Sequence, residues 1–248
     1  MKQRKQQFIL LNKSSPFCYD KNIKFNDTSP HYLLYLQHQK PTENSGKSKT
    51  RFMKIITIRD NYPPSTAPDP VIYLRPDSTL LKNGKPFFIP DFDSRTAMTI
   101  EPVFRLCRLG KAIPQEFADR YYDAVTVGIN FRAIDLEQKL SRAGLPWEMS
   151  NLFDGSAVVG DFADKSQFHP IENLHLRLDI DGKTVQEYST DAMRFMPEHI
   201  ISLLGRYSTL KMGDLIYAGS PAEPIIAHPD MLIEGYLNGQ KLLSFHTR

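Results

Sequence analysis

The chain of 248 residues is 41% hydrophobic and 24% charged, the composition of an ordinary globular protein with a substantial core. No stretch reaches the roughly 18 consecutive apolar residues that a membrane-spanning helix needs, so the sequence predicts no membrane association. The two cysteines, Cys18 and Cys107, form neither a metal-binding spacing nor a disulfide framework, which favours a reducing, cytoplasmic setting.

The net charge of +3 is distributed unevenly along the chain. Residues 1–52 contain ten Lys or Arg and three Asp or Glu, a net charge of +7. The remaining residues contain 21 basic and 25 acidic side chains, a net charge of −4. Residues 53–248 therefore give no electrostatic reason to expect a nucleic-acid partner.

The first 52 residues lack the pattern of a folded element. Their apolar runs, FILL and YLLYL, are short and have no sustained period. FILL is also too short for a secretory signal, and no small-residue cleavage site follows it. Met53 stands directly before KIITIR, the first convincing strand pattern. We predict that residues 1–52 are a disordered extension or a mis-assigned start, with translation beginning at Met53 and one domain spanning residues 53–248. A basic nucleic-acid-binding arm is the alternative, which no motif supports.

The remainder of the chain predicts mostly strands joined by turns. Alternating or β-branched apolar runs predict strands at Lys54–Arg59, Val71–Leu74, Phe87–Ile89, Met98–Leu109, Ala124–Phe131, Leu174–Ile180, Lys183–Tyr188 and Leu215–Ala218, with a last hairpin near the C-terminus. The dipeptides Asn83-Gly84, Asp181-Gly182 and Asn238-Gly239 predict tight hairpin turns. Four prolines make residues 60–70 a loop, and Pro102 predicts a sheet edge or a bulge inside its strand.

A few short helices complete the prediction. Pro114 is placed to start a helix through about Tyr122, and Pro197 is placed to start another. Residues 133–142 have apolar side chains at helical spacing, and Gly144 closes that helix. Strands and helices do not alternate as they do in a doubly wound parallel sheet. The sequence therefore predicts a mixed, mostly β (α+β) domain with a curled or barrel-like sheet.

The strand that begins near Met98 has the pattern of half a metal site. Thr99 and Glu101 are two residues apart, so in an extended segment their side chains leave the same face. With a third oxygen donor from another strand, such a pair could hold a hard divalent cation. The histidines give no such pattern: His169, His175, His199 and His228 are scattered without ligand spacing.

Five collinear motifs give the sequence a family resemblance from about Met53 to the C-terminus. They are YLRPDSTLLKNGKPFFIPDF (73–92), RLGKAIPQEFADRYYDAVTVGINFRAIDLEQ (108–138), GLPWEMSNLFDGSAVVG (144–160), LDIDGKTVQ (178–186) and LKMGDLIYAGSP (210–221). In these segments the chain resembles the fumarylacetoacetate hydrolase family in its short single-domain form. The resemblance implies that family's curled sheet, a homodimer, and Mg²⁺- or Mn²⁺-dependent hydrolysis, isomerisation or decarboxylation of β-keto or 2-oxo acids.

The chain departs from the family pattern at the implied site. The three metal carboxylates of the family fall at Thr99, Glu101 and Asn130, so only Glu101 keeps a charge. Two family lysines fall at Arg75 and Asn151, and the proline-rich loop after Tyr62 lacks the family's His–Glu pair. The sequence therefore predicts that Mg²⁺ or Mn²⁺ binds weakly or not at all. Glu101 could be a surviving metal ligand, a buried acid paired with Arg75 or Arg132, or part of a solvated face.

From these departures we predict a family protein whose metal-dependent activity is weakened or lost, with no confident catalytic residue. Its pocket could still bind a small anionic 2-oxo or dicarboxylic acid. The candidate binding residues are Arg75, Arg132, Asn151, Gln186, Gly219 and Ser220. Gln186 could equally be a strand glutamine satisfied within the fold. Two alternatives stay open: an active hydrolase or isomerase with an altered site, and a non-catalytic binding or regulatory partner of an active homologue.

Overall fold

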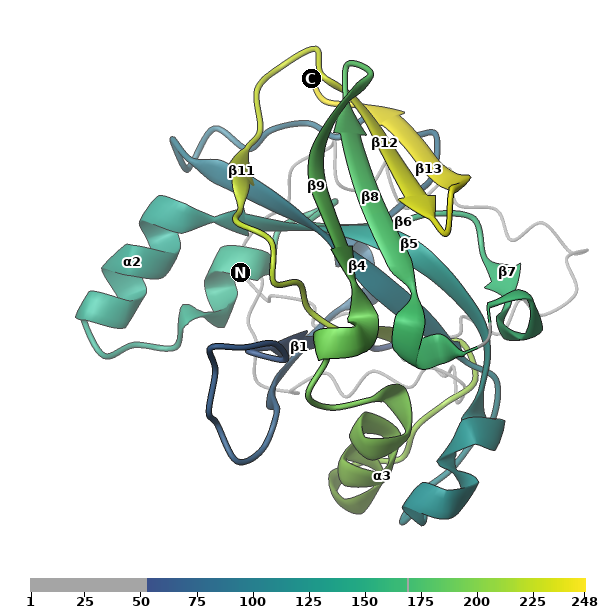
Figure 1. The fold of residues 1–248 in the computed structure, drawn as a ribbon. Helices are drawn as coiled ribbons and strands as arrows, with labels where there is room; N and C mark the ends of the chain where they lie inside the picture. The colour runs from purple at the N-terminus through teal and green to yellow at the C-terminus, as the bar shows by residue number, and fades with distance from the viewer. Residues whose placement is uncertain (1–52, 169) are drawn as a thin grey trace, which may run out of the picture. The chain divides into compact units, whose positions relative to one another are not determined.

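The computed structural model describes residues 53–168 and 170–248. The predictions about residues 1–52 and His169 lie outside these residues. The strands are β1 (Ile55–Arg59), β2 (Val71–Arg75), β3 (Leu80–Lys82), β4 (Thr96–Leu106), β5 (Tyr122–Ala133), β6 (Ala157–Val159), β7 (Ala163–Asp164), β8 (His175–Ile180), β9 (Lys183–Ser189), β10 (Leu215–Tyr217), β11 (Ile225–Ile226), β12 (Leu232–Leu237) and β13 (Gln240–His246). The α-helices are α2 (Ile134–Arg142) and α3 (Pro197–Tyr207). The predicted mostly β fold with few short helices is confirmed (Figure 1).

The two longest strands, β4 and β5, form the middle of the larger sheet. Its order is β2-β1-β10-β4-β5-β6-β3, with β11 added to β4 and β7 added to β5. Almost every residue of β4 and β5 is buried, because both faces of these strands are covered. Such burial explains why apolar side chains occur on both faces of these strands, beside buried polar ones such as Thr99, Glu101 and Asn130.

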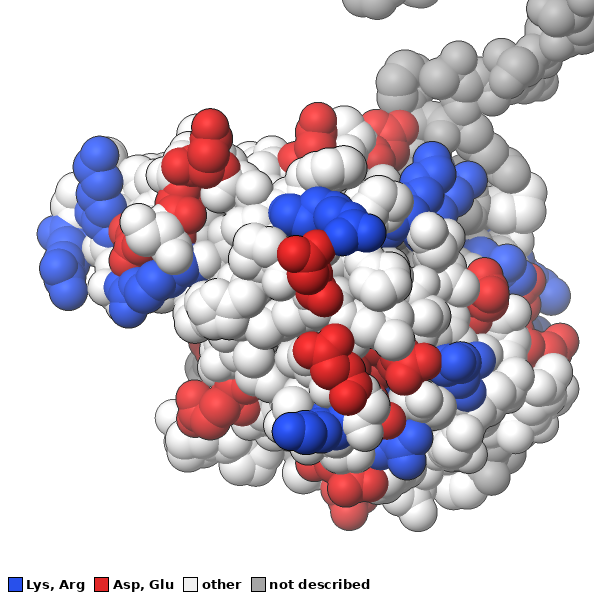
Figure 2. Space-filling view, turned by 90° about the horizontal axis from the view of Figure 1, so that it is seen from above, with Lys and Arg blue, Asp and Glu red and all other residues white. Residues whose placement is uncertain are grey.

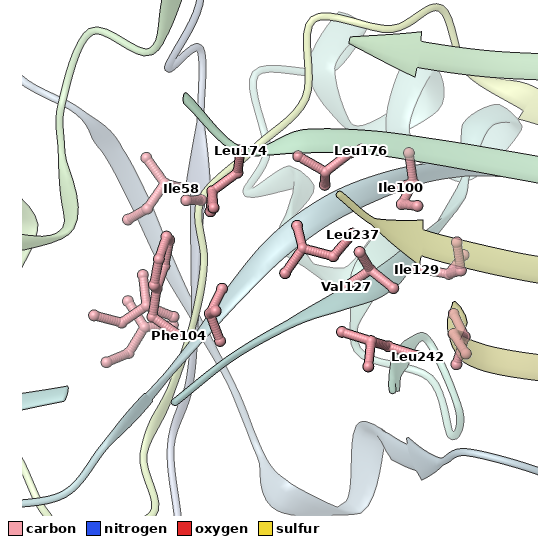
Figure 3. Close-up of a cluster of buried hydrophobic side chains, with 14 of the residues drawn as sticks. Ile58, Ile100, Phe104, Val127, Ile129, Leu174, Leu176, Leu237 and Leu242 are labelled. Atoms are coloured by element: carbon pink, nitrogen blue, oxygen red, sulfur yellow. The ribbon is translucent and has the colours of Figure 1, made fainter. Parts of the chain in front are cut away.

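The second sheet, in the order β13-β12-β8-β9, packs across β4 and β5 (Figure 1). Side chains from the two sheets form one hydrophobic core. Figure 3 shows part of it, including Ile100, Val127 and Ile129 of the larger sheet with Leu176, Leu237 and Leu242 of the smaller. Since side chains alternate along a strand, the burial of Ile100 in this core turns Thr99 and Glu101 to the opposite face of β4.

Pro102 does not lie at a bulge, but on the side away from β5 no strand pairs with it, so of the two predicted alternatives the sheet edge holds locally. It sits in the middle of β4 opposite Val127, and the register shift of this ladder falls between Arg105 and Leu106. The backbone hydrogen-bonding groups of Ile100 and Pro102 point away from β5. The bond from Ala218 N–H to the Pro102 carbonyl shows this (3.1 Å). On that side β10 ends and β11 has not begun, so the missing N–H of proline interrupts no ladder.

The turn at Asn83-Gly84 exists, but the predicted hairpin does not. Gly84 has φ +79°, whereas β3 before the turn pairs in parallel with β6. Phe87–Ile89 is not a strand: Phe87 makes only an isolated bridge to Thr247. The Asn83 side chain accepts from Ser244 N–H (2.9 Å), so this turn attaches to β13 and does not pair its own flanks.

The other local signals gave the expected structures. The dipeptides Asp181-Gly182 and Asn238-Gly239 have positive φ at both residues and join β8 to β9 and β12 to β13. Gly144 (φ +65°) follows α2, as predicted. The segment after Pro114 is helical, but it is a 3-10 helix at Gln115–Tyr121 that passes directly into β5.

The described residues include no helix that is both long and apolar enough to cross a membrane. On the face seen in Figure 2, basic and acidic side chains are interspersed, and neither sign forms a continuous patch. This distribution agrees with the nearly balanced charge of the body of the chain.

Candidate functional site

A cavity of about 580 Å³ opens on the face of β4 and β5 that lies opposite the second sheet. Thr99, Glu101 and Asn130 line it, so the three positions singled out in the sequence do lie together. Thr99 and Asn130 are direct partners in the β4–β5 ladder. The end of β1, the proline-rich loop and the turn after β10 supply the other walls.

Glu101 is buried, with 3% of its surface exposed, which excludes the solvated-face interpretation. Its Oε1 accepts a hydrogen bond from Asn130 Nδ2 (2.7 Å), and its Oε2 accepts one from Gly219 N–H (3.1 Å). Burial raises the pKa of Glu101, while the bond from Asn130 and the charge of Arg75 lower it without cancelling the effect of burial. Both oxygens of Glu101 thus already accept hydrogen bonds within the protein.

The amide of Asn130 links Glu101 to Arg75. Its Oδ1 accepts from Arg75 Nη1 (3.2 Å), while its Nδ2 donates to Glu101. The chemistry fixes this orientation, because a flipped amide would place its oxygen against a carboxylate and its NH₂ against a guanidinium. Asn130 therefore acts as a neutral bridge between an acid and a base.

Arg75 is a buried cation, with 2% of its surface exposed. Its Nη1 also donates to the Ser156 carbonyl (3.1 Å), and its guanidinium lies over the Tyr217 ring at 5.2 Å. Within the described residues its Nε and Nη2 have no hydrogen-bond partner. No ion pair joins Glu101 to Arg75 or Arg132 in this part of the chain. Of the alternatives left open for Glu101, the buried acid beside an arginine is the one that the contacts resemble, with Asn130 bridging Glu101 to Arg75.

Arg132 lines the cavity two residues beyond Asn130 on β5. Its Nη1 lies 3.5 Å from Oε2 of Glu137, on α2. Arg59, at the end of β1, bonds the other oxygen of Glu137 and stacks on Trp147 with 4.5 Å between the guanidinium carbon and the ring centroid. The sequence does not point to Arg59 or Glu137, because only the folded chain brings Arg59, which lines the cavity, against Glu137 of α2.

Asn151 and Gln186 do not line the cavity. Asn151 is fully buried and accepts from the Tyr73 hydroxyl (3.3 Å), behind the cavity wall. Gln186 accepts from Ile100 N–H (3.0 Å) and donates to the Glu223 carbonyl (2.7 Å). Both the oxygen and the nitrogen of the Gln186 amide therefore bond within the protein, which agrees with the alternative that Gln186 is a strand glutamine satisfied within the fold.

The proline-rich loop is tied to the body of the protein. Arg194 donates to the Ala67 carbonyl (2.6 Å) and to Ser65 Oγ (3.2 Å). At the start of the loop, Asn61 donates to the Ala218 carbonyl (2.9 Å) and accepts from Phe195 N–H (2.8 Å). The loop is a fixed wall of the cavity and contains neither His nor Glu.

Gly219 and Ser220 form the turn after β10, and both line the cavity. Gly219 has φ +83°, and a Cβ on it would lie 3.0 Å from the Ile58 carbonyl. We expect Gly219→Ala to lower the free energy of unfolding by about 2–3 kcal/mol, from the left-handed backbone and this contact together. The measurement is chemical denaturation of the two proteins.

Gly182→Ala is the matched control for that substitution. Gly182 has a similar φ of +75° with nothing within 4 Å of an added Cβ, so its cost should be about 1 kcal/mol. Equal losses in the two variants would show that the close approach of Gly219 to Ile58 has no energetic importance.

The donors at this site do not fit the Mg²⁺ or Mn²⁺ that the resemblance implies. A hard dication depends on carboxylate charge, and of the three positions where the family has metal ligands only Glu101 is a carboxylate, with both oxygens bound to N–H groups. The Asn130 carbonyl oxygen is bound by Arg75, and the Thr99 hydroxyl is a neutral ligand. Among residues 53–168 and 170–248, no three His, Cys, Asp or Glu side chains are grouped so that they could hold a metal.

The fold agrees with a match of the sequence to a known family, although the residues around Glu101 depart from that family's metal site. The model of the fumarylacetoacetate (FAA) hydrolase C-terminal domain matches residues 38–237, and the chain therefore belongs to the fumarylacetoacetate hydrolase family. Two similar proteins are the mitochondrial oxaloacetate tautomerase FAHD1 of Rattus norvegicus, 30% identical, and that of Arabidopsis thaliana, 29% identical. Each alignment covers 62% of this chain and 69% of the relative.

Solved structures show the same fold. A fumarylacetoacetate hydrolase family protein from Yersinia pestis has a TM-score of 0.75 at 24% identity, covering 80% of this chain and 93% of the other. Fumarylpyruvate hydrolase from Pseudomonas aeruginosa, solved with Mn²⁺ and pyruvate, has a TM-score of 0.72 at 23% identity, covering 79% and 89%. These structures show the fold, and the match to the family model confirms the predicted family.

Proposed function

We propose that this protein binds a small anionic 2-oxo or dicarboxylic acid in the Glu101 cavity, and that the metal-dependent chemistry of its family is weakened or lost. The main support is the orientation of the Asn130 amide. Where the family pattern places a third carboxylate, this chain has a neutral group whose N–H occupies an oxygen of Glu101. A dication at this position would have to displace that bond and would meet one negative charge in place of three.

The binding part of the proposal is supported by the arginines around the cavity. Arg59 and Arg132 line it, and arginine binds carboxylates through paired N–H groups. The pyruvate in the fumarylpyruvate hydrolase structure is an acid of the same class. The cavity, at about 580 Å³, lies in the size range of small-molecule sites.

Two calorimetric titrations test the proposal. We expect Mg²⁺ and Mn²⁺ to bind no more tightly than about 1 mM, and pyruvate or oxaloacetate to bind in the presence of EDTA. Metal binding much tighter than about 1 mM would contradict the loss of the metal site. Failure of every tested 2-oxo acid to bind without metal would contradict the ligand-binding role.

An active enzyme with an altered site is the second candidate. It is favoured by one observation, the buried carboxyl of Glu101 whose pKa burial raises, beside an open cavity. Turnover of oxaloacetate or an acylpyruvate that disappears in Glu101→Gln would support it. The homodimer, the role as a partner of an active homologue, the absence of a nucleic-acid partner and the cytoplasmic location stay predictions.

A further inference from the structure

We infer that the cavity selects an oxo or hydroxy acid with a single carboxylate, which is held at one end of the cavity by Arg132 and Arg59. This inference rests on the proposed ligand binding and adds the class of ligand and the residues that select it. It follows from the unequal distribution of charge around the cavity.

The arginine end has unused donors. Arg132 approaches Glu137 only at 3.5 Å, the limit of a hydrogen bond, and no other partner of its guanidinium is recorded among the described residues. Arg59 holds the second oxygen of Glu137, and its stacking on Trp147 fixes the plane of its guanidinium. Two guanidinium groups thus share the one carboxylate of Glu137, and neither has another ion pair in the described part of the chain. A ligand carboxylate supplies the missing negative charge.

The Glu101 end has no spare positive charge. Arg75 lies behind Asn130 and does not line the cavity, so its charge is opposed by that of Glu101 through the amide bridge. Glu223 also lines the cavity and is negative, and it lies on this side because Gln186 bonds both its carbonyl and the backbone N–H of Ile100, next to Glu101. A second ligand carboxylate placed here would therefore meet acids and no free base.

The β-sheet register separates the two ends. Arg132 is opposite Ala97, while Glu101 lies four residues further along β4, about 13 Å at strand spacing. Thr99 stands between these levels and lines the cavity, and its hydroxyl has no recorded hydrogen bond in the described part of the chain. This hydroxyl is placed for a neutral ligand oxygen, a ketone or a hydroxyl.

Two probes of equal backbone length test the selection. 2-Oxopentanoate and 2-oxoglutarate both have five carbons and differ by one carboxylate, and their affinities are measured by calorimetry with EDTA present. We expect 2-oxopentanoate to bind at least about tenfold more tightly, because of the like charges that the second carboxylate would meet. Equal or tighter binding of 2-oxoglutarate would overturn the inference and leave the proposed function intact. If neither acid nor pyruvate binds, both fail.

Two variants test the residues. Arg132→Gln should weaken 2-oxopentanoate binding by about 10- to 100-fold, since a charge-assisted pair is lost. Arg105→Gln is its matched control: this arginine pairs with Asp123 away from the cavity, and the affinity should not change. Glu137→Gln keeps a polar partner for the arginines but removes the competing charge, so binding should become several-fold tighter. Unchanged affinity in Arg132→Gln, or weaker binding in Glu137→Gln with an unchanged melting temperature, would overturn the assignment.

Discussion

Arg75→Met is expected to lower the free energy of unfolding by about 3–5 kcal/mol, the cost of removing one partner from a buried charged network. Methionine fills much of the same volume but leaves the Asn130 oxygen without its donor, while the Ser156 carbonyl keeps only its bond from Phe131 N–H (2.8 Å). It also removes the cation that offsets the buried Glu101. Denaturant-induced unfolding of the two proteins gives the difference.

The control for this substitution is Arg105→Met. Arg105 is 40% exposed and pairs with Asp123, so its loss should cost less than about 1 kcal/mol. The double variant Arg75→Met with Glu101→Gln should recover part of the loss, because the unpaired acid is removed as well. If Arg75→Met costs no more than the control, the buried arginine does not stabilise the network through Asn130.

The second large effect is a gain of metal binding. We expect Thr99→Glu combined with Asn130→Asp to raise the affinity for Mn²⁺ by at least about 100-fold, since each added carboxylate near the ion contributes on the order of a few kcal/mol. The aspartate introduced in place of Asn130 can still accept from Arg75, while the loss of the NH₂ group frees an oxygen of Glu101. The longer glutamate side chain has room to extend because Thr99 faces the cavity. Calorimetric titration measures the change.

Thr99→Gln is the control for the metal variant. Glutamine has the shape of glutamate without its charge, so this variant should show no gain in affinity for Mn²⁺. An unchanged affinity in the double variant would show that the neutral residues at these two positions are not what weakens metal binding.

Local signals were predicted well from the sequence, and contacts between distant segments were not. The Asp181-Gly182 and Asn238-Gly239 hairpins depend only on the backbone preferences of the turn residues. The Asn83-Gly84 dipeptide has the same preferences, but β3 finds a parallel partner in β6, so its flanks do not pair. The environment of Pro102 depends on where β10 ends, which no pattern near the proline encodes.

In the site, too, the local features were predicted from the sequence and the contacts between distant residues were not. The spacing of Thr99 and Glu101 placed both side chains on one face, and the resemblance added Asn130. The bridge from Asn130 to Arg75 joins residues 55 positions apart in the sequence, and the pairing of Arg59 with Glu137 joins residues 78 positions apart. Such contacts arise only when the sheet and α2 are assembled, because no local sequence pattern indicates which distant residue each of them will meet.

The anchoring of the proline-rich loop by Arg194 and Asn61 has a consequence for ligand affinity. Ordering a flexible backbone costs about 1–2 kcal/mol of conformational entropy for each residue fixed. In this chain the loop is fixed when the protein folds, so an incoming acid does not have to order it. The site is preorganised, so the binding free energy from the few contacts of a small ligand is not offset by the entropic cost of ordering the loop.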